Sequence, residues 1–204
     1  MPDPSPKKLL VATTNRKKLE ELKSLLAKLD LELCCLSDFP GLREVPENGK
    51  TFEENAAAKA LGYARQVRLL TLAEDSGLCC DALEGSPGIF SARFAGAAKS
   101  DLENNLKVLR LLKKVPDNCR TAHFCSAAAI AEPDRLVGVV TGEVHGFIAH
   151  ESRGQNGFGY DPIFYYPAFA KTFGEVPSEM KHQVSHRAQA LERAKQLLKK
   201  YLAE

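Results

Sequence analysis

The segment from Lys8 to Thr13 limits the possible folds most, because its four central residues are all apolar. An apolar run without alternation is typical of a parallel strand that is covered on both faces. The polar loop Thr13–Asn15 follows at once and opens into a segment with leucines at helical spacing, namely Leu19, Leu22, Leu25, Leu26 and Leu29. A strand, a short loop and a helix in this order predict an α/β fold, with a central sheet flanked by helices.

The loop between this strand and helix is a candidate phosphate site. The N-terminus of a helix presents unpaired backbone N–H groups and a positive dipole end, which favour anions. Lys17 and Lys18 lie in the first helical turn, where the dipole disfavours cations, and this conflict suggests a function. The loop lacks the glycines of a P-loop. A solvated, lysine-rich helix start remains the alternative reading.

Two consecutive carboxylates, Glu74 and Asp75, form the second candidate site. They follow the apolar run Leu70–Ala73, which we predict to be a buried strand, and precede the turn pair Ser76-Gly77. A second strand is predicted from Leu78 to Leu83. At a strand end that enters a glycine turn, both carboxylates can face one crevice, where they would hold Mg²⁺ and activate a water molecule. The alternative is a solvated strand end.

The remaining predicted elements complete an α/β order. Capping-box sequences at Thr51–Glu54 and Ser100–Glu103 predict the starts of two helices. The second of these helices is expected to carry Leu102, Leu106, Leu109 and Leu112 at helical spacing. Further strands are predicted at Leu31–Leu36, at Thr121–Ala131 and Arg135–Ile148 as a hairpin, and at Ile163–Tyr166, with a final helix from about Ser185.

A glycine-rich loop, Arg153–Pro162, carries two aromatic residues and an acid. Its glycines let the backbone approach a ligand closely, while Phe158 and Tyr160 offer ring faces to a nucleobase. A flexible hairpin loop is the alternative.

The basic segment Lys181–Arg187 precedes the last helix, and we interpret its side chains as hydrogen-bond donors to an anion or a base.

Composition narrows the class of protein. A net charge of +2, from 28 Lys and Arg against 26 Asp and Glu, argues against a nucleic-acid surface, so that positive sites must be local. No apolar run is long enough for a membrane span. The six cysteines lack zinc spacing and are expected to be small hydrophobic residues in a reducing cytoplasm. We expect a disordered lead over residues 1–7 and one domain over residues 8–204.

Five separated motifs, in order along the chain, resemble the inosine/xanthosine triphosphate pyrophosphatase family. They are Ala12–Lys18, Thr51–Asn55 with Lys59-Ala60, Ala73–Leu78, Gly85–Arg93, and Gly157–Pro162 with Lys181 and Ser185–Arg187. Together they span residues 8–200. The resemblance implies an elongated, two-lobed single domain with a mixed central sheet and an active-site cleft between the lobes. It also implies a cytoplasmic homodimer with no nucleic-acid or membrane partner.

The activity implied by the resemblance is Mg²⁺-dependent hydrolysis of ITP, dITP and XTP to the monophosphate and pyrophosphate, with Mn²⁺ as a possible substitute. This reaction removes miscoding nucleotides from the pool. Carried over by motif, Glu47, Glu74 and Asp75 would hold the metal, and Asp75 would also be the general base. The substrate-binding residues would be Thr13, Thr14, Asn15, Arg16, Lys17, Lys18, Lys59, Ser76, Phe158, Gly159, Tyr160, Asp161, Lys181, His186 and Arg187.

This chain departs from the family pattern at two positions, with Thr14 where many bacterial members have glycine and Glu74 where many have aspartate. Base choice would depend on donors such as Arg187 and His186, because hypoxanthine and xanthine carry a 6-oxo acceptor where adenine carries an amino donor. Two alternatives stay open at this point. One is a hydrolase of another modified nucleotide class, and the other is a nucleotide-binding regulatory module without turnover.

Overall fold

The computed structural model describes residues 7–13, 22, 25–26 and 29–203. The chain divides into two compact units, each built from several segments. Unit 1 comprises Met1–Asp75, Ala127–Thr141 and Ala190–Glu204, and unit 2 comprises Ser76–Ser126 and Gly142–Gln189. Among the described residues, no helix combines the length and apolar character that crossing a bilayer requires.

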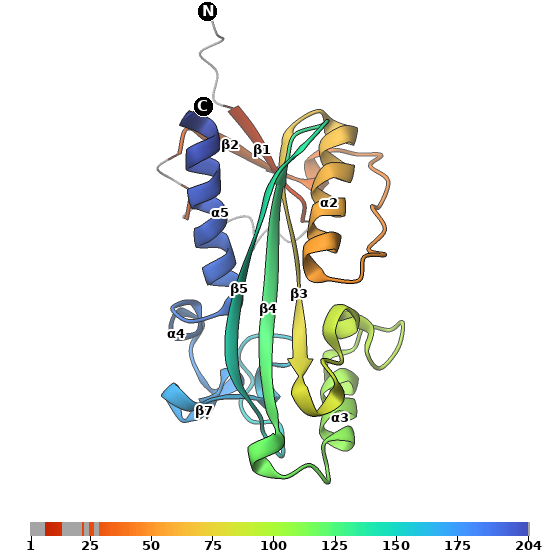
Figure 1. The fold of residues 1–204 in the computed structure, drawn as a ribbon, viewed down its shortest axis with the longest axis vertical. Coiled ribbons are helices and arrows are strands. Elements are labelled where there is room, and N and C mark those ends of the chain that lie inside the picture. Colours follow the sequence, from red (N-terminus) through yellow and green to blue (C-terminus); the bar gives the residue numbers. More distant parts are fainter. Residues whose placement is uncertain (1–6, 14–21, 23–24, 27–28, 204) are drawn as a thin grey trace, which may run out of the picture. The chain divides into compact units, whose positions relative to one another are not determined.

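Seven strands form one mixed sheet in the order β2-β1-β3-β4-β5-β6-β7 (Figure 1). Their bounds are β1 Lys7–Val11, β2 Leu31–Cys35, β3 Leu70–Cys80, β4 Thr121–Ala131, β5 Leu136–Ile148, β6 Phe164–Tyr166 and β7 Lys171–Thr172. β1 pairs in parallel with both β2 and β3, as its unbroken apolar run predicted, whereas β6 pairs antiparallel with β5 and β7. The predicted mixed sheet flanked by helices is therefore confirmed.

The helices are α2 Phe52–Val67, α3 Asp101–Leu111, α4 Ser178–His182 and α5 His186–Ala203. In unit 1, α2 and α5 lie on either side of the strands (Figure 1). Short 3₁₀ helices occur at Leu36–Asp38, Asp81–Leu83, Gly88–Arg93, Asp117–Cys119, Asp161–Ile163, Pro167–Phe169 and Phe173–Glu175. The predicted helices that start at Thr51, Ser100 and Ser185 are present, as are most of the predicted strands, with small shifts at their ends, while β7 and α4 were not predicted. The helix predicted after β1 lies mostly outside the described residues.

The N-terminus of α2 forms half of the predicted capping box. The Thr51 hydroxyl accepts a hydrogen bond from the Glu54 N–H at 3.1 Å, as an N-cap residue should. The Glu54 carboxylate, however, accepts from the Lys50 N–H at 2.6 Å, one residue before the cap. The cap therefore still satisfies the first turn of α2 and fixes where the helix begins.

The predicted turn at Ser76-Gly77 is wrong, because β3 continues through it as one strand of 11 residues. Gly77 is needed there for close approach: a Cβ on it would overlap the side-chain oxygen of Ser91. That oxygen accepts a hydrogen bond from the Leu78 N–H at 2.9 Å. The predicted second strand to Leu83 also ends early, since Asp81–Leu83 is a 3₁₀ helix.

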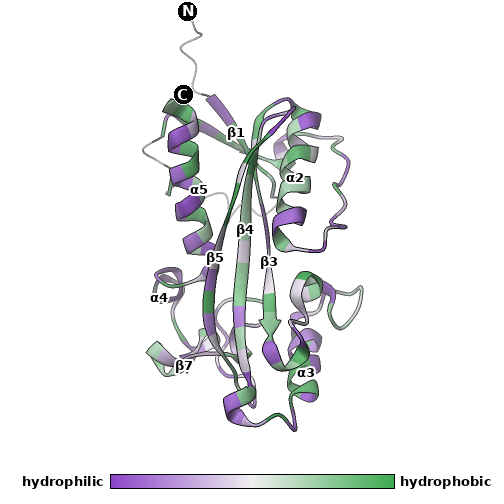
Figure 2. Cartoon of the chain, viewed as in Figure 1, coloured by the Kyte–Doolittle hydropathy of each residue, from purple (hydrophilic) through white to green (hydrophobic). Residues whose placement is uncertain are grey.

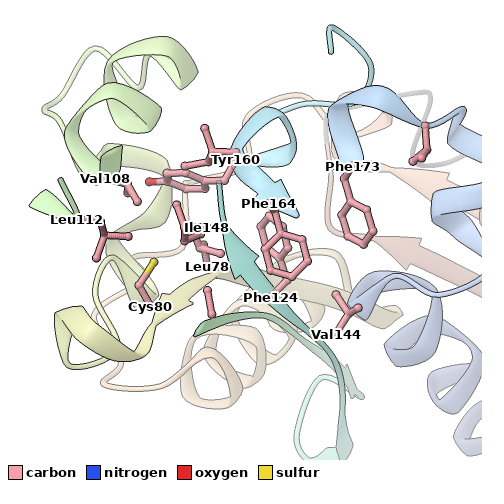
Figure 3. Close-up of a cluster of buried hydrophobic side chains, with 13 residues drawn as sticks. Leu78, Cys80, Val108, Leu112, Phe124, Val144, Ile148, Tyr160, Phe164 and Phe173 are labelled. Carbon is pink, nitrogen blue, oxygen red and sulfur yellow. The ribbon is translucent and has the colours of Figure 1, made fainter. Parts of the chain in front are cut away.

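Each unit has its own hydrophobic core. In unit 1, β1, β3, β4 and α5 contribute apolar side chains that include Leu9, Leu72, Ile130, Ala194 and Leu198. Hydrophilic and hydrophobic bands alternate along α5, as expected for a helix with one buried face (Figure 2). In unit 2, buried rings and aliphatic chains gather around Phe124, Phe164 and Phe173 (Figure 3).

Only part of the leucine pattern of α3 is buried. Leu112 lies in the core of unit 2 and Leu109 packs against it. Leu102 and Leu106 are 63% and 49% exposed, whereas Asn104 and Asn105 are buried together with Val108. The leucine spacing was helical, but local periodicity does not say which side of a helix meets the core. The partners of the two asparagines decide it, because a buried amide needs hydrogen bonds that an alanine or leucine does not.

A buried arginine, which the sequence did not single out, ties the end of α3 to β5. Arg120 is 2% exposed and donates to the carbonyl oxygens of Ile148, Leu112 and Ala149 at 2.8, 2.6 and 2.8 Å. Its burial lowers the pKa of its guanidinium below the ordinary value. The three carbonyls compensate for that burial and satisfy backbone oxygens at the end of α3 and beyond β5.

The cysteines lead to a first testable prediction. None of the six is in a disulfide, and Cys119 is exposed. Burial raises the pKa of Cys34 and Cys79 to about 11 and that of Cys80 to about 12. At pH 8 at most about one such thiol in a thousand is then a thiolate, so reaction is slow. We expect a disulfide reagent to titrate Cys119 rapidly in the native protein and all six thiols in denaturant. Fewer than six thiols in denaturant would contradict the structure.

Candidate active site

Unit 1 contains a polar pocket of about 540 Å³. Three carboxylates and one lysine line it, namely Glu44, Glu47, Glu74 and Lys59, together with Thr13 and apolar neighbours. These residues come from the end of β1, the loop before α2, α2 itself and β3. The structure thus brings together Thr13, Glu47, Lys59 and Glu74, which were predicted as site residues from separate parts of the chain. The predicted residues Thr14, Asn15, Arg16, Lys17 and Lys18 lie outside the described residues.

Lys59 joins the loop and the strand within this pocket. Its ammonium forms an ion pair with Glu47 and donates to the backbone oxygen of Glu74 at 3.0 Å. The lysine side chain is only 17% exposed, so a charged partner offsets part of its desolvation. The pocket therefore presents a cation already balanced by one acid.

Asp75 is held by α2 through Asn55. The Asn55 amide nitrogen donates to Asp75 Oδ2 at 2.9 Å, and its Oδ1 accepts from the Gly49 N–H at 2.7 Å. Asn55 is 1% exposed, so its buried amide depends on these two bonds for its hydrogen-bond partners. The expectation that Glu74 and Asp75 enter one crevice rested on the turn that is absent. Glu74 lines the pocket described above, and Asp75 is not among its lining residues.

The chemistry of the pocket fits a hard divalent cation. Among the residues that the structure describes, no three His, Cys, Asp or Glu side chains already converge on a metal position. Mg²⁺ does not require such a cage, since it usually binds through one or two carboxylates plus substrate phosphates and water. Glu47 and Glu74, which line one pocket, supply that number of carboxylates.

Unit 2 contains a second pocket, of about 210 Å³. It is lined by backbone and side chains of Ser76, Gly77, Ser91, Ala92, Asp101, Phe124, Phe158, Gly159, Tyr160, Asp161, Lys181 and His186. Seven of the predicted substrate-binding residues are in this set. Arg187 is half-buried and begins α5 together with His186, and it is not among the lining residues.

The two aromatic residues of the glycine-rich loop have different environments. Phe158 is 65% exposed, so its ring can receive a planar ligand. Tyr160 is 4% exposed, belongs to the core of unit 2 (Figure 3), and donates its hydroxyl to the Ser91 carbonyl at 2.8 Å. Burial raises the pKa of Tyr160 above its ordinary value. Tyr160 therefore anchors the loop, while Phe158 offers a ring face.

Asp161 organises the other side of this loop. It is 1% exposed, and its Oδ2 accepts from Lys181 Nζ at 2.5 Å and from the Phe158 N–H at 2.9 Å. Burial raises the pKa of Asp161, and the neighbouring lysine opposes that shift. Lys181 Nζ also lies 4.8 Å from the centre of the Phe158 ring, within cation–π range. One acid thus fixes both a cation and the exposed ring.

His186 forms part of the pocket wall. It is 8% exposed and stacks on Phe124, with ring centroids 4.7 Å apart and planes within 9°. Ser185 precedes α5, and its hydroxyl accepts from the Ala188 N–H at 3.2 Å, as predicted for an N-cap residue. The cap fixes where α5 begins and therefore where the His186 ring lies.

Two residues of the site were missed as functional by sequence reasoning. Asn55 ends one of the motifs without a role, yet it holds Asp75. Ser91 lies in a quoted motif without a role, yet it accepts from both Tyr160 and Leu78. Their partners are 13 to 69 residues away in the chain, and no local pattern signals such contacts.

Comparison with known sequences gives a family match over most of the chain. The sequence model of the Ham1 family matches residues 9–197. The dITP/XTP pyrophosphatase of Desulforamulus reducens is 47% identical over 191 residues, which cover 94% of this chain and 95% of that protein. The dITP/XTP pyrophosphatase of Listeria monocytogenes is 45% identical over 197 residues, covering 97% of this chain and 95% of that protein.

Solved structures give the same result for the fold. A HAM1 protein from Coxiella burnetii has a TM-score of 0.89 at 38% identity, and the match covers 95% of this chain and 99% of that one. A nucleoside-triphosphatase, dITP/XTP pyrophosphatase, from Mycobacterium abscessus has a TM-score of 0.80 at 43% identity, covering 92% and 97%.

Proposed function

The chain belongs to the Ham1 family, and we therefore propose that it hydrolyses dITP, ITP and XTP to the nucleoside monophosphate and pyrophosphate. The observation that carries this proposal is the gathering of Glu47, Lys59 and Glu74 in one pocket, since they come from three separate parts of the chain and were expected to bind metal or phosphate. The names of relatives with 45–47% identity over nearly their full length support the substrate class. Such a reaction would remove miscoding nucleotides from the pool.

The proposed chemistry assigns phosphate and metal to the pocket of unit 1. Glu47 and Glu74 would hold Mg²⁺, or Mn²⁺ in its place, with Asp75 as a third candidate ligand. When bound, the cation neutralises phosphate charge and polarises the reacting phosphoryl group. Asp75 would take the proton of the attacking water, in an orientation fixed by the Asn55 amide. Lys59 would bind phosphate oxygens, together with Thr13 and the loop up to Lys18.

The pocket of unit 2 is assigned to the base. Phe158 would stack on the purine, because its ring is the exposed one of the two aromatic residues. Asp161 and Tyr160 would hold in place the loop that carries this ring. His186 and Arg187 would donate to the 6-oxo group of hypoxanthine or xanthine, with Lys181 at the edge of the ring. The homodimer and the cytoplasmic location are also part of this proposal, and they rest on the family resemblance.

The decisive experiment identifies the products. We expect ITP, with Mg²⁺ and without added pyrophosphatase, to give IMP and pyrophosphate in equal amounts, because attack is assigned to the α-phosphorus. ATP should be used less efficiently by roughly 10- to 150-fold, the equivalent of one charge-assisted hydrogen bond. Anion-exchange separation of pyrophosphate from orthophosphate over a panel of ITP, dITP, XTP, GTP and ATP measures both. Orthophosphate and IDP as first products would contradict the proposal.

A further inference from the structure

Two polar side chains of α3 bind both backbone groups of a single glycine in the pocket of unit 2. Asp101 Oδ2 accepts a hydrogen bond from the Gly159 N–H at 2.7 Å. Asn105 Nδ2 donates to the Gly159 carbonyl oxygen at 3.0 Å. Residues four apart on a helix lie on the same face. One face of α3 therefore holds the backbone of Gly159 on both sides of its Cα.

Gly159 has no side chain by which the fold can hold it, so its backbone bonds fix its position. Its φ of +62° lies in the left-handed region, and a Cβ there would meet nothing within 4 Å. The preceding residue, Phe158, donates its N–H to Asp161. The Phe158 ring is therefore placed between two anchors, Asp161 on one side and the pair Asp101 and Asn105 on the other.

The polar buried face of α3 supports a role at the pocket rather than in the core. Asn105 is 4% exposed at a position where an aliphatic residue would avoid the cost of burying an amide. Its neighbour Asn104 accepts from the Ala95 N–H at 2.7 Å and donates to the Ala92 carbonyl at 3.3 Å. Ala92, Asp101 and Gly159 all line the same pocket.

We propose that Asp101 and Asn105 are positioning residues for base recognition. They fix the backbone of Gly159 and thereby the position of the Phe158 ring. This inference rests on the proposed function, because the pocket of unit 2 is there assigned to the base. Loss of either bond should free the loop and weaken binding of the base, while the phosphate-binding groups of unit 1 are unchanged.

The test compares Asp101→Ala and Asn105→Ala with two matched variants. Asp101→Asn keeps an acceptor oxygen for the Gly159 N–H and should rescue the wild-type behaviour. Glu103→Ala removes a carboxylate from the exposed face of the same helix and should change nothing. Asp101 is exposed, so Asp101→Ala should fold even where Asn105→Ala does not.

Two readouts separate positioning from a merely structural effect. The first is KM and kcat for ITP: the two alanine variants should raise KM about tenfold with little change in kcat, and leave inhibition by base-free tripolyphosphate unchanged. The second is chymotrypsin cleavage after Phe158, relative to cleavage after the exposed Phe90, followed by mass spectrometry; it should increase several-fold.

Unchanged cleavage after Phe158 would overturn the inference, because the loop would not depend on these bonds. Faster cleavage with an unchanged KM would overturn it too, since the bonds would then serve stability alone. Equal losses of affinity for ITP and tripolyphosphate would also count against it. Failure of the wild-type chain to hydrolyse ITP would contradict the proposed function instead, and the cleavage assay would still decide whether Asp101 and Asn105 hold the loop.

Discussion

Asp75→Asn should lower kcat for ITP by ~10²–10⁴, the range typical for loss of a general base. The substitution keeps the size of the side chain but removes its negative charge and its ability to accept a proton. The variant should fold, because an asparagine oxygen at position 75 can still accept the hydrogen bond from Asn55. Steady-state kinetics with ITP at saturating Mg²⁺, and a thermal melt of the same preparation, provide the measurement.

The matched control for this variant is Asp81→Asn, which removes the same charge just beyond the end of β3. The Asp81 side chain is 60% exposed, and its ion pair with His123 is 4.0 Å long, so the change should be nearly neutral. Near-wild-type turnover in Asp75→Asn would exclude Asp75 as the base. An equal loss in both variants would show that general electrostatics, rather than proton transfer, is responsible.

Gly157→Ala is expected to have the largest effect in the pocket of unit 2. A Cβ at this position would overlap Oδ2 of Asp161, the atom that accepts from both Lys181 and Phe158. Displacing it leaves the part-buried lysine without its close partner, and breaking a buried ion pair typically costs ~3–5 kcal/mol. We expect the free energy of unfolding to fall by about 3 kcal/mol and kcat/KM for ITP to fall at least tenfold.

Gly159→Ala controls for backbone strain in this comparison. Both glycines have positive φ, +76° and +62°, so both alanines incur a left-handed penalty of ~1–2 kcal/mol. Only the Cβ at 157 meets the Asp161 carboxylate, so the difference between the variants measures the loss of that contact. Urea denaturation monitored by circular dichroism gives both values. Equal destabilisation would show that Asp161 tolerates the additional methyl group.

Patterns local in the sequence predicted much of the fold. The unbroken apolar run of β1 gave a parallel strand, the Thr51 and Ser100 caps gave the starts of α2 and α3, and the Glu-Pro-Asp turn gave the hairpin of β4 and β5. Each of these patterns extends over no more than about ten consecutive residues. The family resemblance read from five motifs is also confirmed over residues 9–197.

The errors arose where a distant partner overrides the local signal. Ser76-Gly77 has turn composition, but Ser91 accepts the Leu78 N–H and requires a glycine beside it, so the strand continues. The leucines of α3 have helical spacing, yet Leu102 and Leu106 are exposed, because buried asparagines with partners at the pocket take up part of the face that Leu112 shares with the core. Arg120 could not be distinguished from surface arginines, since its three carbonyl partners are 8 to 29 residues away.

The residues of the candidate site could be predicted from the sequence, but which of them are exposed and which are buried could not. The family resemblance implied roles for Glu47, Lys59 and Glu74, and the structure places them in one pocket. The resemblance did not separate Phe158, which is exposed, from Tyr160, which is core, because both are aromatic residues of one loop. Exposure depends on contacts such as that of Tyr160 with Ser91, which only the folded chain reveals.

The hydrogen bond from Asn55 to Asp75 has a consequence for how these two positions can change during evolution. Asn55 accepts from Gly49 and donates to Asp75, so aspartate at position 55 would set two carboxylate oxygens against each other. A single base change converts an asparagine codon into an aspartate codon, and the same product arises by spontaneous deamidation. That change should be harmful on its own and tolerated by the fold only when position 75 becomes an amide. For stability, positions 55 and 75 are therefore epistatic: the fold can hold one acid on either the helix or the strand, but not one on each, while the proposed chemistry requires it at position 75.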